Sequence, residues 1–128
     1  MNDSAPQPSE RVRSILVIDD SSDVLSLCTA VLKHAGYRSH TASCGADGLA
    51  IFAREPIDLV ILDMGLPDMD GEEVLAALRA LRVDVRVLIS SGYTREKLDR
   101  IRSEEVVGFL RKPWGLKELL EIIEVALR

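Results

Sequence analysis

Apolar and polar positions follow two alternating patterns along the chain. Short runs rich in β-branched residues are typical of strands buried on both faces of a parallel sheet, and stretches with an apolar residue every three or four positions are typical of amphipathic helices. The patterns predict strands at 15–18, 37–42, 58–62, 85–90 and 106–110, and helices at 24–35, 45–54, 74–81, 94–103 and 116–127. A strand followed by a helix therefore recurs five times.

This alternation predicts one α/β domain. Right-handed crossovers place the strands in a five-stranded parallel sheet with helices on both faces, the doubly wound flavodoxin-like class, for which the strand order is 2-1-3-4-5. In that order the first and third strands are neighbours. Residues 1–13 are almost without apolar side chains and contain Pro6 and Pro8, so they are predicted to form a flexible N-terminal tail before a domain over 14–128.

Acidic residues close the first and third of these strands. Asp19 and Asp20 follow the first strand, and Asp63 follows the third. An Asp at this place is also a common helix cap, and residues 20–23 offer several caps for the next helix. Three carboxylates at one sheet edge repel one another, however, unless a metal or a proton compensates. Oxygen ligands without His or Cys favour Mg²⁺ over zinc, so the sequence predicts a magnesium site.

The fourth and fifth strands bring further polar groups to the same edge. Ser90 and Ser91 end the fourth strand, and Lys112 follows the fifth. An Asp nucleophile, a divalent metal, a hydroxyl and a lysine around one point make a site for a phosphoryl group. Metal and ammonium neutralise its oxygens while the carboxylate attacks in line.

Several motifs resemble the receiver domain of bacterial two-component response regulators, over about residues 14–127. They are the segments 15–21 (ILVIDDS), 63–71 (DMGLPDMDG), 91–92 (SG) and 109–114 (FLRKPW). The resemblance implies that Asp63 accepts a phosphoryl group from the phosphohistidine of a sensor histidine kinase or a histidine phosphotransfer protein. It also implies that Asp20 and Asp63 bind Mg²⁺ directly, that Asp19 binds it through water, and that the Gly65 carbonyl adds a ligand.

The resemblance also assigns the residues that respond to the phosphoryl group. Lys112 would pair with one phosphoryl oxygen, and Ser91 would hydrogen-bond another after its loop moves inward, with Ser90 as the alternative hydroxyl. Phe109 occupies a switch position often held by Tyr, so it can swing inward but has no hydroxyl to bond a carbonyl. Trp114 is expected to be a partly buried anchor for the last helix, and the Lys112–Pro113 bond is expected to be cis.

Composition narrows the partners. The chain has 128 residues, 47% of them hydrophobic, a net charge of −5 and a pI near 5.0, which argues against direct nucleic-acid binding through the whole surface. No apolar run reaches the roughly 20 residues of a membrane-spanning helix, and the N-terminal stretch lacks the apolar core of a signal peptide. Cys28 and Cys44 show no metal-ligand spacing, so they are predicted to be free thiols in the cytoplasm.

Two other functions compete with a phosphorylation switch. A small Mg²⁺-dependent phosphatase of the haloacid dehalogenase type also uses a strand-end Asp, but it needs a second Asp where Gly65 stands. A flavin carrier needs a Ser/Thr/Gly phosphate loop where Asp19 and Asp20 would repel phosphate. The favoured function is a phosphoacceptor that is no enzyme on other substrates and catalyses only its own phosphorylation and dephosphorylation, either as a stand-alone regulator or as part of a larger protein such as a hybrid sensor kinase.

The output of the switch is predicted to be altered binding to another protein, which the sequence does not identify. The unphosphorylated domain is expected to be a monomer and the phosphorylated one at most a weak dimer. The responding face is predicted to comprise residues 94–103, residues 106–110 and the last helix.

Overall fold

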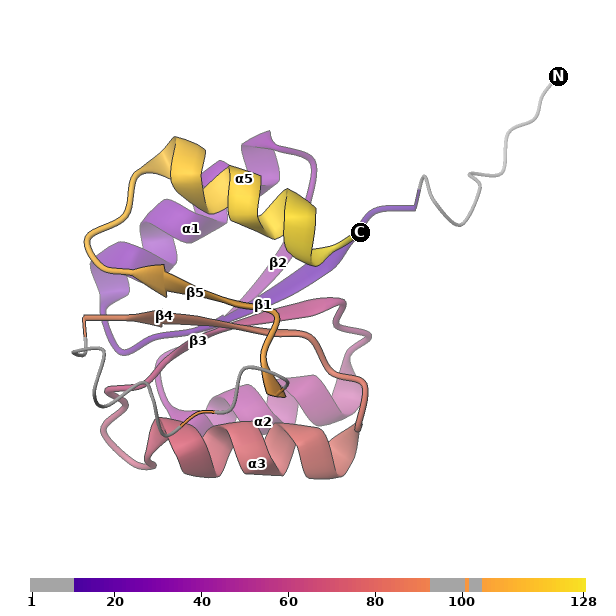
Figure 1. Ribbon diagram of the computed structural model, residues 1–128, viewed down its shortest axis with the longest axis vertical. Coiled ribbons are helices and arrows are strands. Elements are labelled where there is room, and N and C mark those ends of the chain that lie inside the picture. Colours follow the sequence, from indigo (N-terminus) through magenta and orange to yellow (C-terminus); the bar gives the residue numbers. More distant parts are fainter. Residues whose placement is uncertain (1–10, 93–100, 102–104) are drawn as a thin grey trace, which may run out of the picture.

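The chain forms one parallel five-stranded sheet in the order β2-β1-β3-β4-β5, which confirms the predicted topology (Figure 1). The computed structural model describes residues 11–92, 101 and 105–128. The strands are β1 (Ser14–Ile18), β2 (Arg38–Ala42), β3 (Leu59–Asp63), β4 (Val87–Ser91) and β5 (Gly108–Arg111), and the described helices are α1 (Ser22–His34), α2 (Gly45–Arg54), α3 (Gly71–Leu81) and α5 (Leu116–Ala126).

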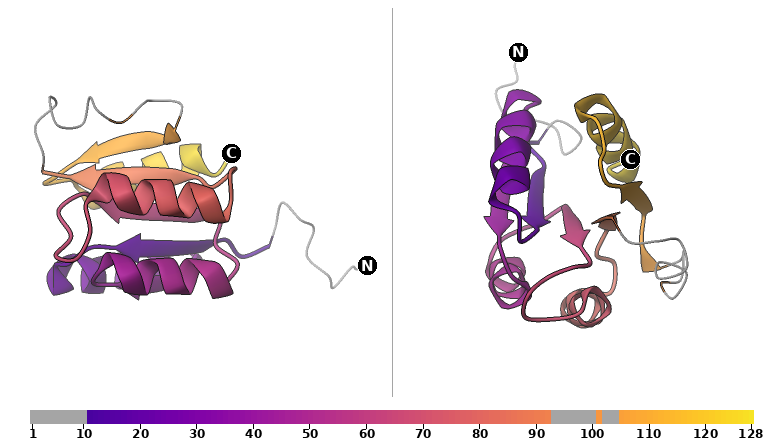
Figure 2. Two further views of the ribbon diagram at one scale, coloured as in Figure 1. Left: turned by 90° about the horizontal axis from the view of Figure 1, so that it is seen from below. Right: turned by 90° about the vertical axis from the view of Figure 1, so that its left-hand side faces the viewer.

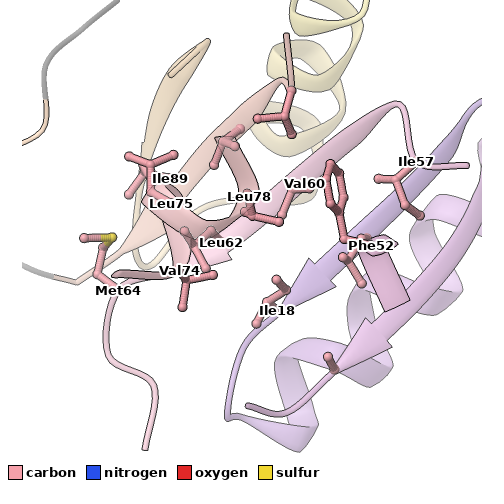
Figure 3. Close-up of a cluster of buried hydrophobic side chains, with 14 of the residues drawn as sticks. Ile18, Phe52, Ile57, Val60, Leu62, Met64, Val74, Leu75, Leu78 and Ile89 are labelled. Atoms are coloured by element: carbon pink, nitrogen blue, oxygen red, sulfur yellow. The ribbon is translucent and has the colours of Figure 1, made fainter. Parts of the chain in front are cut away.

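Helices cover both faces of the sheet. α1 and α5 lie on one face and α2 and α3 on the other (Figures 1 and 2). Side chains alternate between the faces along β1, where Leu16 and Ile18 join the core under α2 and α3, and Ile15 and Val17 join the core under α1 and α5. Figure 3 shows the first of these cores. Because both faces are covered, the central strands read as unbroken apolar runs.

Two glycines explain where the first helices end and how closely they pack. Gly36 has a φ of 93°, a left-handed conformation that ends α1 at low steric cost, and the Tyr37 amide returns to the Leu32 carbonyl. Gly48 lies in α2 where an added Cβ would come within 2.5 Å of the Ile18 side chain, so α2 can approach β1 closely only with glycine there.

The start of α2 is capped by a residue from a distant loop. Cys44 stands at the N-cap position and makes no side-chain cap. Instead Asp68, in the loop between β3 and α3, accepts hydrogen bonds from the backbone amides of Gly45 at 2.7 Å and Ala46 at 2.9 Å. These bonds, that of Ala46 first, lower the pKa of Asp68. The loop that follows Asp63 is thereby tied to α2.

The ends of β4 and β5 differ from the predicted ranges. β4 begins at Val87 instead of residue 85 and continues to Ser91, while β5 begins at Gly108 and continues to Arg111. Periodicity locates an apolar run, but strand ends are set by pairing, and the pairing of Ser91 with Arg111 is invisible in the hydrophobic pattern. Both strands therefore reach one residue further toward the acidic edge than predicted.

Helix α1 buries a narrower stripe than predicted. The apolar residues that recur at helical spacing are Val24, Leu27, Cys28, Val31, Leu32 and Ala35. Of these, Cys28 and Leu32 are buried, but Leu27 is 44% exposed. The predicted helix at 94–103 lies outside the described residues except for Ile101, which is buried in the core under α2 and α3. Most of the predicted tail, residues 1–10, also lies outside them. Among the described helices, none has the length and apolar character needed to cross a membrane.

Candidate functional site

Three carboxylates meet at the carboxyl edge of the sheet. One oxygen from each of Asp19, Asp20 and Asp63 lies within 4.8 Å of the others. β1 and β3 pair directly, with Ile18 opposite Leu62, so the residues that follow them are forced together. Asp19 is 2% and Asp63 7% exposed, whereas Asp20 is exposed. The structure thus brings together the three acids that the sequence singled out.

Lys112 reaches into this cluster from the segment after β5. Its Nζ donates a hydrogen bond to Asp19 Oδ2 at 2.7 Å and lies 3.6 Å from Asp63 Oδ1. Burial alone would lower the pKa of Lys112, but the hydrogen bond to Asp19 and the negative charge of Asp63 outweigh it and raise that pKa. The lysine is therefore a fixed cation that touches one acid and faces another.

The Asp63 carboxyl sits where negative charge is poorly compensated. Burial, followed by the negative charge of Asp19, raises the pKa of Asp63, although Lys112 and a hydrogen bond from the Gly65 amide act in the opposite direction. A cation bound nearby would stabilise the ionised form of a carboxylate in this environment. Gly65 itself is exposed at the start of the loop after β3, beside the cluster that it was expected to complete.

Both carboxylate oxygens of Asp19 accept hydrogen bonds. Its Oδ1 accepts a hydrogen bond from the Ser21 amide at 2.9 Å while its Oδ2 accepts from Lys112. Ser21 in turn is the N-cap of α1, where its Oγ accepts from the Val24 amide at 3.3 Å. Both readings of this segment therefore hold: Ser21 caps the helix, and the aspartates before it form the acidic cluster.

The two serines at the end of β4 have different surroundings. Ser90 pairs in register with Asp63, and its Oγ accepts a hydrogen bond from the Trp114 indole N–H at 3.0 Å. Ser91 is the last residue of β4, and its carbonyl accepts from the Lys112 amide at 2.9 Å. Both serines are 1% exposed. Phe109, in β5, is 40% exposed, so its ring is turned outward in this structure.

An apolar groove that the sequence did not predict lies beside the acidic edge. Val24 and Leu27 of α1 face Lys112, Pro113 and Trp114 across a hollow of about 410 Å³. The Lys112–Pro113 bond is cis, as expected. Helical spacing groups Leu27 with the apolar residues of α1 and cannot show which of them line a groove. A leucine 44% exposed next to the lysine was the signal that only the structure supplies.

Comparison with known proteins decides the family. The family model for the response regulator receiver domain matches residues 15–124. The chain belongs to this family. Receiver domains are in general phosphoacceptors and not enzymes that turn over a separate substrate, and they bind Mg²⁺ at an acidic pocket. The matches do not support the alternative of a haloacid dehalogenase phosphatase.

Individual relatives agree with this assignment. The transcriptional regulatory protein KdpE of Mycobacterium tuberculosis is 37% identical over 116 residues, which cover 89% of this chain and 50% of KdpE, so this receiver domain spans about half the length of that relative. Sporulation initiation phosphotransferase F of Bacillus subtilis is 33% identical over 113 residues, covering 86% of this chain and 90% of the relative.

Solved structures show the same fold. The CheY-like receiver domain protein from Methanospirillum hungatei JF-1 has a TM-score of 0.86 at 28% identity, covering 91% of this chain and 94% of that chain. The response regulator TrrA from Thermotoga maritima, solved in complex with Mg(2+)-BeF, has a TM-score of 0.82 at 28% identity and is covered completely, against 91% of this chain.

The donor set of this receiver domain fits Mg²⁺, which prefers carboxylate, carbonyl and water oxygens. We expect Mg²⁺ to stabilise the wild-type protein and Asp20→Asn to remove most of that effect, because Asp20 is the exposed acid of the cluster. At a Mg²⁺ concentration ten times the dissociation constant, the expected gain in the free energy of unfolding is about 1.4 kcal/mol. Chemical denaturation with and without Mg²⁺ measures it.

The matched control is Asp23→Asn, which neutralises an exposed acid in the first turn of α1. It should keep the full response to Mg²⁺. An undiminished response in Asp20→Asn would show that Asp20 is not a ligand.

Proposed function

We propose that this receiver domain is the phosphoacceptor of a two-component phosphorelay and that Asp63 takes the phosphoryl group from a phosphohistidine of a sensor kinase or a histidine phosphotransfer protein. The observation that carries the proposal is the position of Asp63 at the end of a central strand, with Lys112 Nζ at 3.6 Å and two more carboxylates within 4.8 Å. A nucleophilic oxygen, a fixed cation and a set of hard oxygen ligands then surround one point.

The transfer replaces one phosphorus bond with another. A carboxylate oxygen of Asp63 forms a P–O bond as the P–N bond of the donor breaks, and the electron pair of that bond returns to the imidazole ring, which takes up a proton. Asp20 and Asp63, with Asp19 through water and the Gly65 carbonyl, would hold Mg²⁺, which when bound neutralises phosphoryl oxygens. Lys112 supplies the protein's own positive charge toward the same oxygens.

Phosphorylation changes the contacts of the residues around Asp63. In the resting structure Lys112 is closer to Asp19, at 2.7 Å, than to Asp63. The new phosphoryl oxygens offer Lys112 and Ser91 additional partners, and this difference in contacts is what shifts the conformational equilibrium. Phe109, 40% exposed at rest, then moves inward and changes the surface around β5 through packing alone.

The apolar groove provides a place for the donor protein. Lys112 lines both the groove and the acidic site, so a helix seated against Val24, Leu27 and Trp114 would present its phosphohistidine next to Asp63. The occupant we assign is therefore an apolar helix face of the histidine-bearing donor. Small donors such as acetyl phosphate do not need the groove.

The test compares two donors on one variant. Leu27→Asp should slow phosphorylation by a phosphorylated histidine phosphotransfer protein at least about tenfold, since an interface anchor of this kind contributes roughly 1.4 kcal/mol or more. Acetyl phosphate should still phosphorylate the variant at the wild-type rate. Intact-mass spectrometry over time measures both reactions. In the wild-type protein the added group should be labile to hydroxylamine, as an acyl phosphate is.

Leu81→Asp is the matched control, since Leu81 is 53% exposed on α3, on the opposite face of the sheet. It should leave both reactions unchanged. A Leu27→Asp protein that takes the phosphoryl group normally from the protein donor would place the docking surface elsewhere. A wild-type protein that gains no phosphoryl group from either donor would refute the proposed function.

The remaining features of the proposal concern the cellular setting. We place the domain in the cytoplasm, where its phosphohistidine donors are, with residues 1–13 as a tail before the receiver domain at 14–128. Its output is altered binding to another protein through the face that includes Phe109, β5 and α5, with a monomeric resting state. The acidic composition, with a net charge of −5, gives no support to direct nucleic-acid binding.

A further inference from the structure

The segment that carries Lys112 is attached to β4 at two points. The Lys112 amide donates to the Ser91 carbonyl at 2.9 Å, which extends the pairing of β5 with β4. Two residues later, after Pro113, the Trp114 indole N–H donates to Ser90 Oγ at 3.0 Å. Two hydrogen bonds therefore flank Pro113: one from the Lys112 backbone before it and one from the Trp114 side chain after it. Their acceptors, Ser91 and Ser90, are consecutive residues of β4.

The second attachment joins a buried serine to a half-buried tryptophan. Ser90 is 1% exposed, and Trp114 is half-buried against the core under α1 and α5. A buried indole N–H without an acceptor is unfavourable, so the hydrogen bond to Ser90 defines one orientation of the ring. An indole that only filled space would not need an acceptor at this position in β4.

Ser90 is also placed beside the reacting carboxylate. It pairs in register with Asp63 of β3. On its other side β4 pairs with β5, which ends one residue before Lys112. The hydrogen bond therefore fixes the Lys112 segment relative to the very strand that lies next to the phosphoacceptor strand. If Trp114 moved away from Ser90, the hydrogen bond from the Lys112 amide to Ser91 would remain, but the one that follows Pro113 would be lost.

We propose that the hydrogen bond between Trp114 and Ser90 makes both of them positioning residues, which hold the Lys112 segment against β4 and keep the Lys112 ammonium directed at Asp19 and Asp63. The expected effect on the phosphorylation rate rests on the proposed function, but the expected effect on the position of Lys112 does not. Because Trp114 also lines the groove, a donor protein seated there contacts the residue that fixes the lysine.

The hydrogen bond itself can be observed directly. Trp114 is the single tryptophan of the chain, so a ¹⁵N-labelled sample gives one indole N–H resonance. Ser90→Ala should move this resonance upfield and speed its exchange with water severalfold, and Ser90→Thr, which keeps the hydroxyl, should restore the wild-type position. An indole resonance that does not respond to Ser90→Ala would overturn the proposal.

The position of Lys112 is tested by chemical labelling, which needs no phosphorylation. Acetylation of lysines by a water-soluble ester, followed by mass spectrometry of peptides, should show Lys112 modified severalfold faster in Ser90→Ala and in Trp114→Phe than in the wild type. Lys117, exposed on α5, is the internal control and should react equally in all three proteins. Equal labelling of Lys112 in all three would overturn the proposal.

Phosphorylation rates distinguish the positioning role of Ser90 and Trp114 from the docking role of Leu27. Ser90→Ala and Trp114→Phe should each lower the rate of phosphorylation by acetyl phosphate at saturating Mg²⁺ about tenfold, because a small displacement of a charged group that contacts the transferred phosphoryl group is costly. The same factor should appear with the protein donor for Ser90→Ala, unlike for Leu27→Asp, while the Mg²⁺ concentration for half-maximal rate should stay within about twofold of wild type. The double variant should be no slower than the slower single variant.

The outcomes distinguish this inference from the proposed function. Faster labelling of Lys112 in a protein that accepts no phosphoryl group would uphold the positioning role and refute the phosphoacceptor role. A wild-type rate in Ser90→Ala, in a protein that is phosphorylated normally, would refute the positioning role alone. Additive losses in the double variant would mean that Ser90 and Trp114 act separately, which also contradicts the proposal.

Discussion

Replacing Asp63 with asparagine is expected to abolish phosphorylation by acetyl phosphate in the presence of Mg²⁺. The wild-type protein should gain one phosphoryl group, and the variant should gain none, because the carboxamide lacks the negatively charged oxygen that attacks phosphorus. Asp63 ends the central strand β3 and is the acid whose pKa is raised by burial. Intact-mass spectrometry measures the result.

Asp84→Asn serves as the control, because this acid has a side chain 83% exposed in the turn before β4, far from the carboxyl edge. It should be phosphorylated as the wild type is. A phosphoryl group on Asp63→Asn, located by peptide mapping on Asp19 or Asp20, would show that another carboxylate of the cluster is the acceptor.

The Asp63→Asn variant should also be more stable than the wild type at neutral pH. Folding raises the pKa of Asp63 above its ordinary value of 3.8, so stability falls as the pH rises from 3.8 through the raised value, and the ionised carboxylate opposes folding at higher pH. Asp63→Asn removes this term, and we expect a gain on the order of 1 kcal/mol at pH 7 without Mg²⁺. The gain should vanish as the pH falls below 3.8, where the carboxyl is protonated in both states. Urea denaturation at several pH values measures it.

Replacing Lys112 with alanine should have the second largest effect and should separate occupancy of the site from its conformational response. Mg²⁺ should still bind, because the carboxylates remain. Beryllofluoride, a mimic of the phosphoryl group, should no longer produce the wild-type amide shift changes around Phe109, since the cation that contacts the added group is gone. Two-dimensional NMR with and without beryllofluoride gives the comparison, and Ser91→Ala is expected to show the same loss.

Lys112→Ala also affects stability in the opposite direction to Asp63→Asn. The pKa of Lys112 is raised in the folded protein, so its contribution is fully present below the ordinary value of 10.5 and is lost only as the pH rises through the raised value. The variant leaves the Asp19 carboxylate buried without its cation, at a cost of about 1 to 3 kcal/mol at neutral pH. Lys117→Ala, on the exposed face of α5, should change neither property. Wild-type shift changes in Lys112→Ala would remove Lys112 from the switch.

The sequence predicted the fold well because strands buried on both faces have an unmistakable composition. β1 and β3 each contain an unbroken run of four apolar residues, and Gly36 marks the end of α1 by its left-handed backbone. The placement of Asp19, Asp20 and Asp63 then followed from strand order alone. These features depend on local pattern and topology, which a sequence carries directly.

The features that the sequence did not predict depend on contacts between side chains. Leu27 stands at helical spacing with the buried residues Cys28 and Leu32, yet it is 44% exposed and lines the groove beside Trp114. Likewise, the sequence left open whether Ser90 or Ser91 is the switch hydroxyl. It could not show that the Trp114 indole donates to Ser90, because no pattern of apolar residues reveals the orientation of a side chain. The ends of β4 and β5 were missed because polar residues such as Arg111 can pair in a ladder as well as apolar ones.

The cap that Asp68 places on α2 links the first turn of that helix to the loop after β3. Gly45 and Ala46 receive their acceptor from a residue more than 20 positions further along the chain, so these two amides gain it only when β3 and the loop after it are in place. Amide hydrogen exchange at these two positions should therefore report the opening of the loop after Asp63 and not the fraying of α2 itself. If phosphorylation loosened this loop, the amides of Gly45 and Ala46 would lose protection from hydrogen exchange. The change would then be visible at the start of α2, in a segment that does not contact the phosphoryl group.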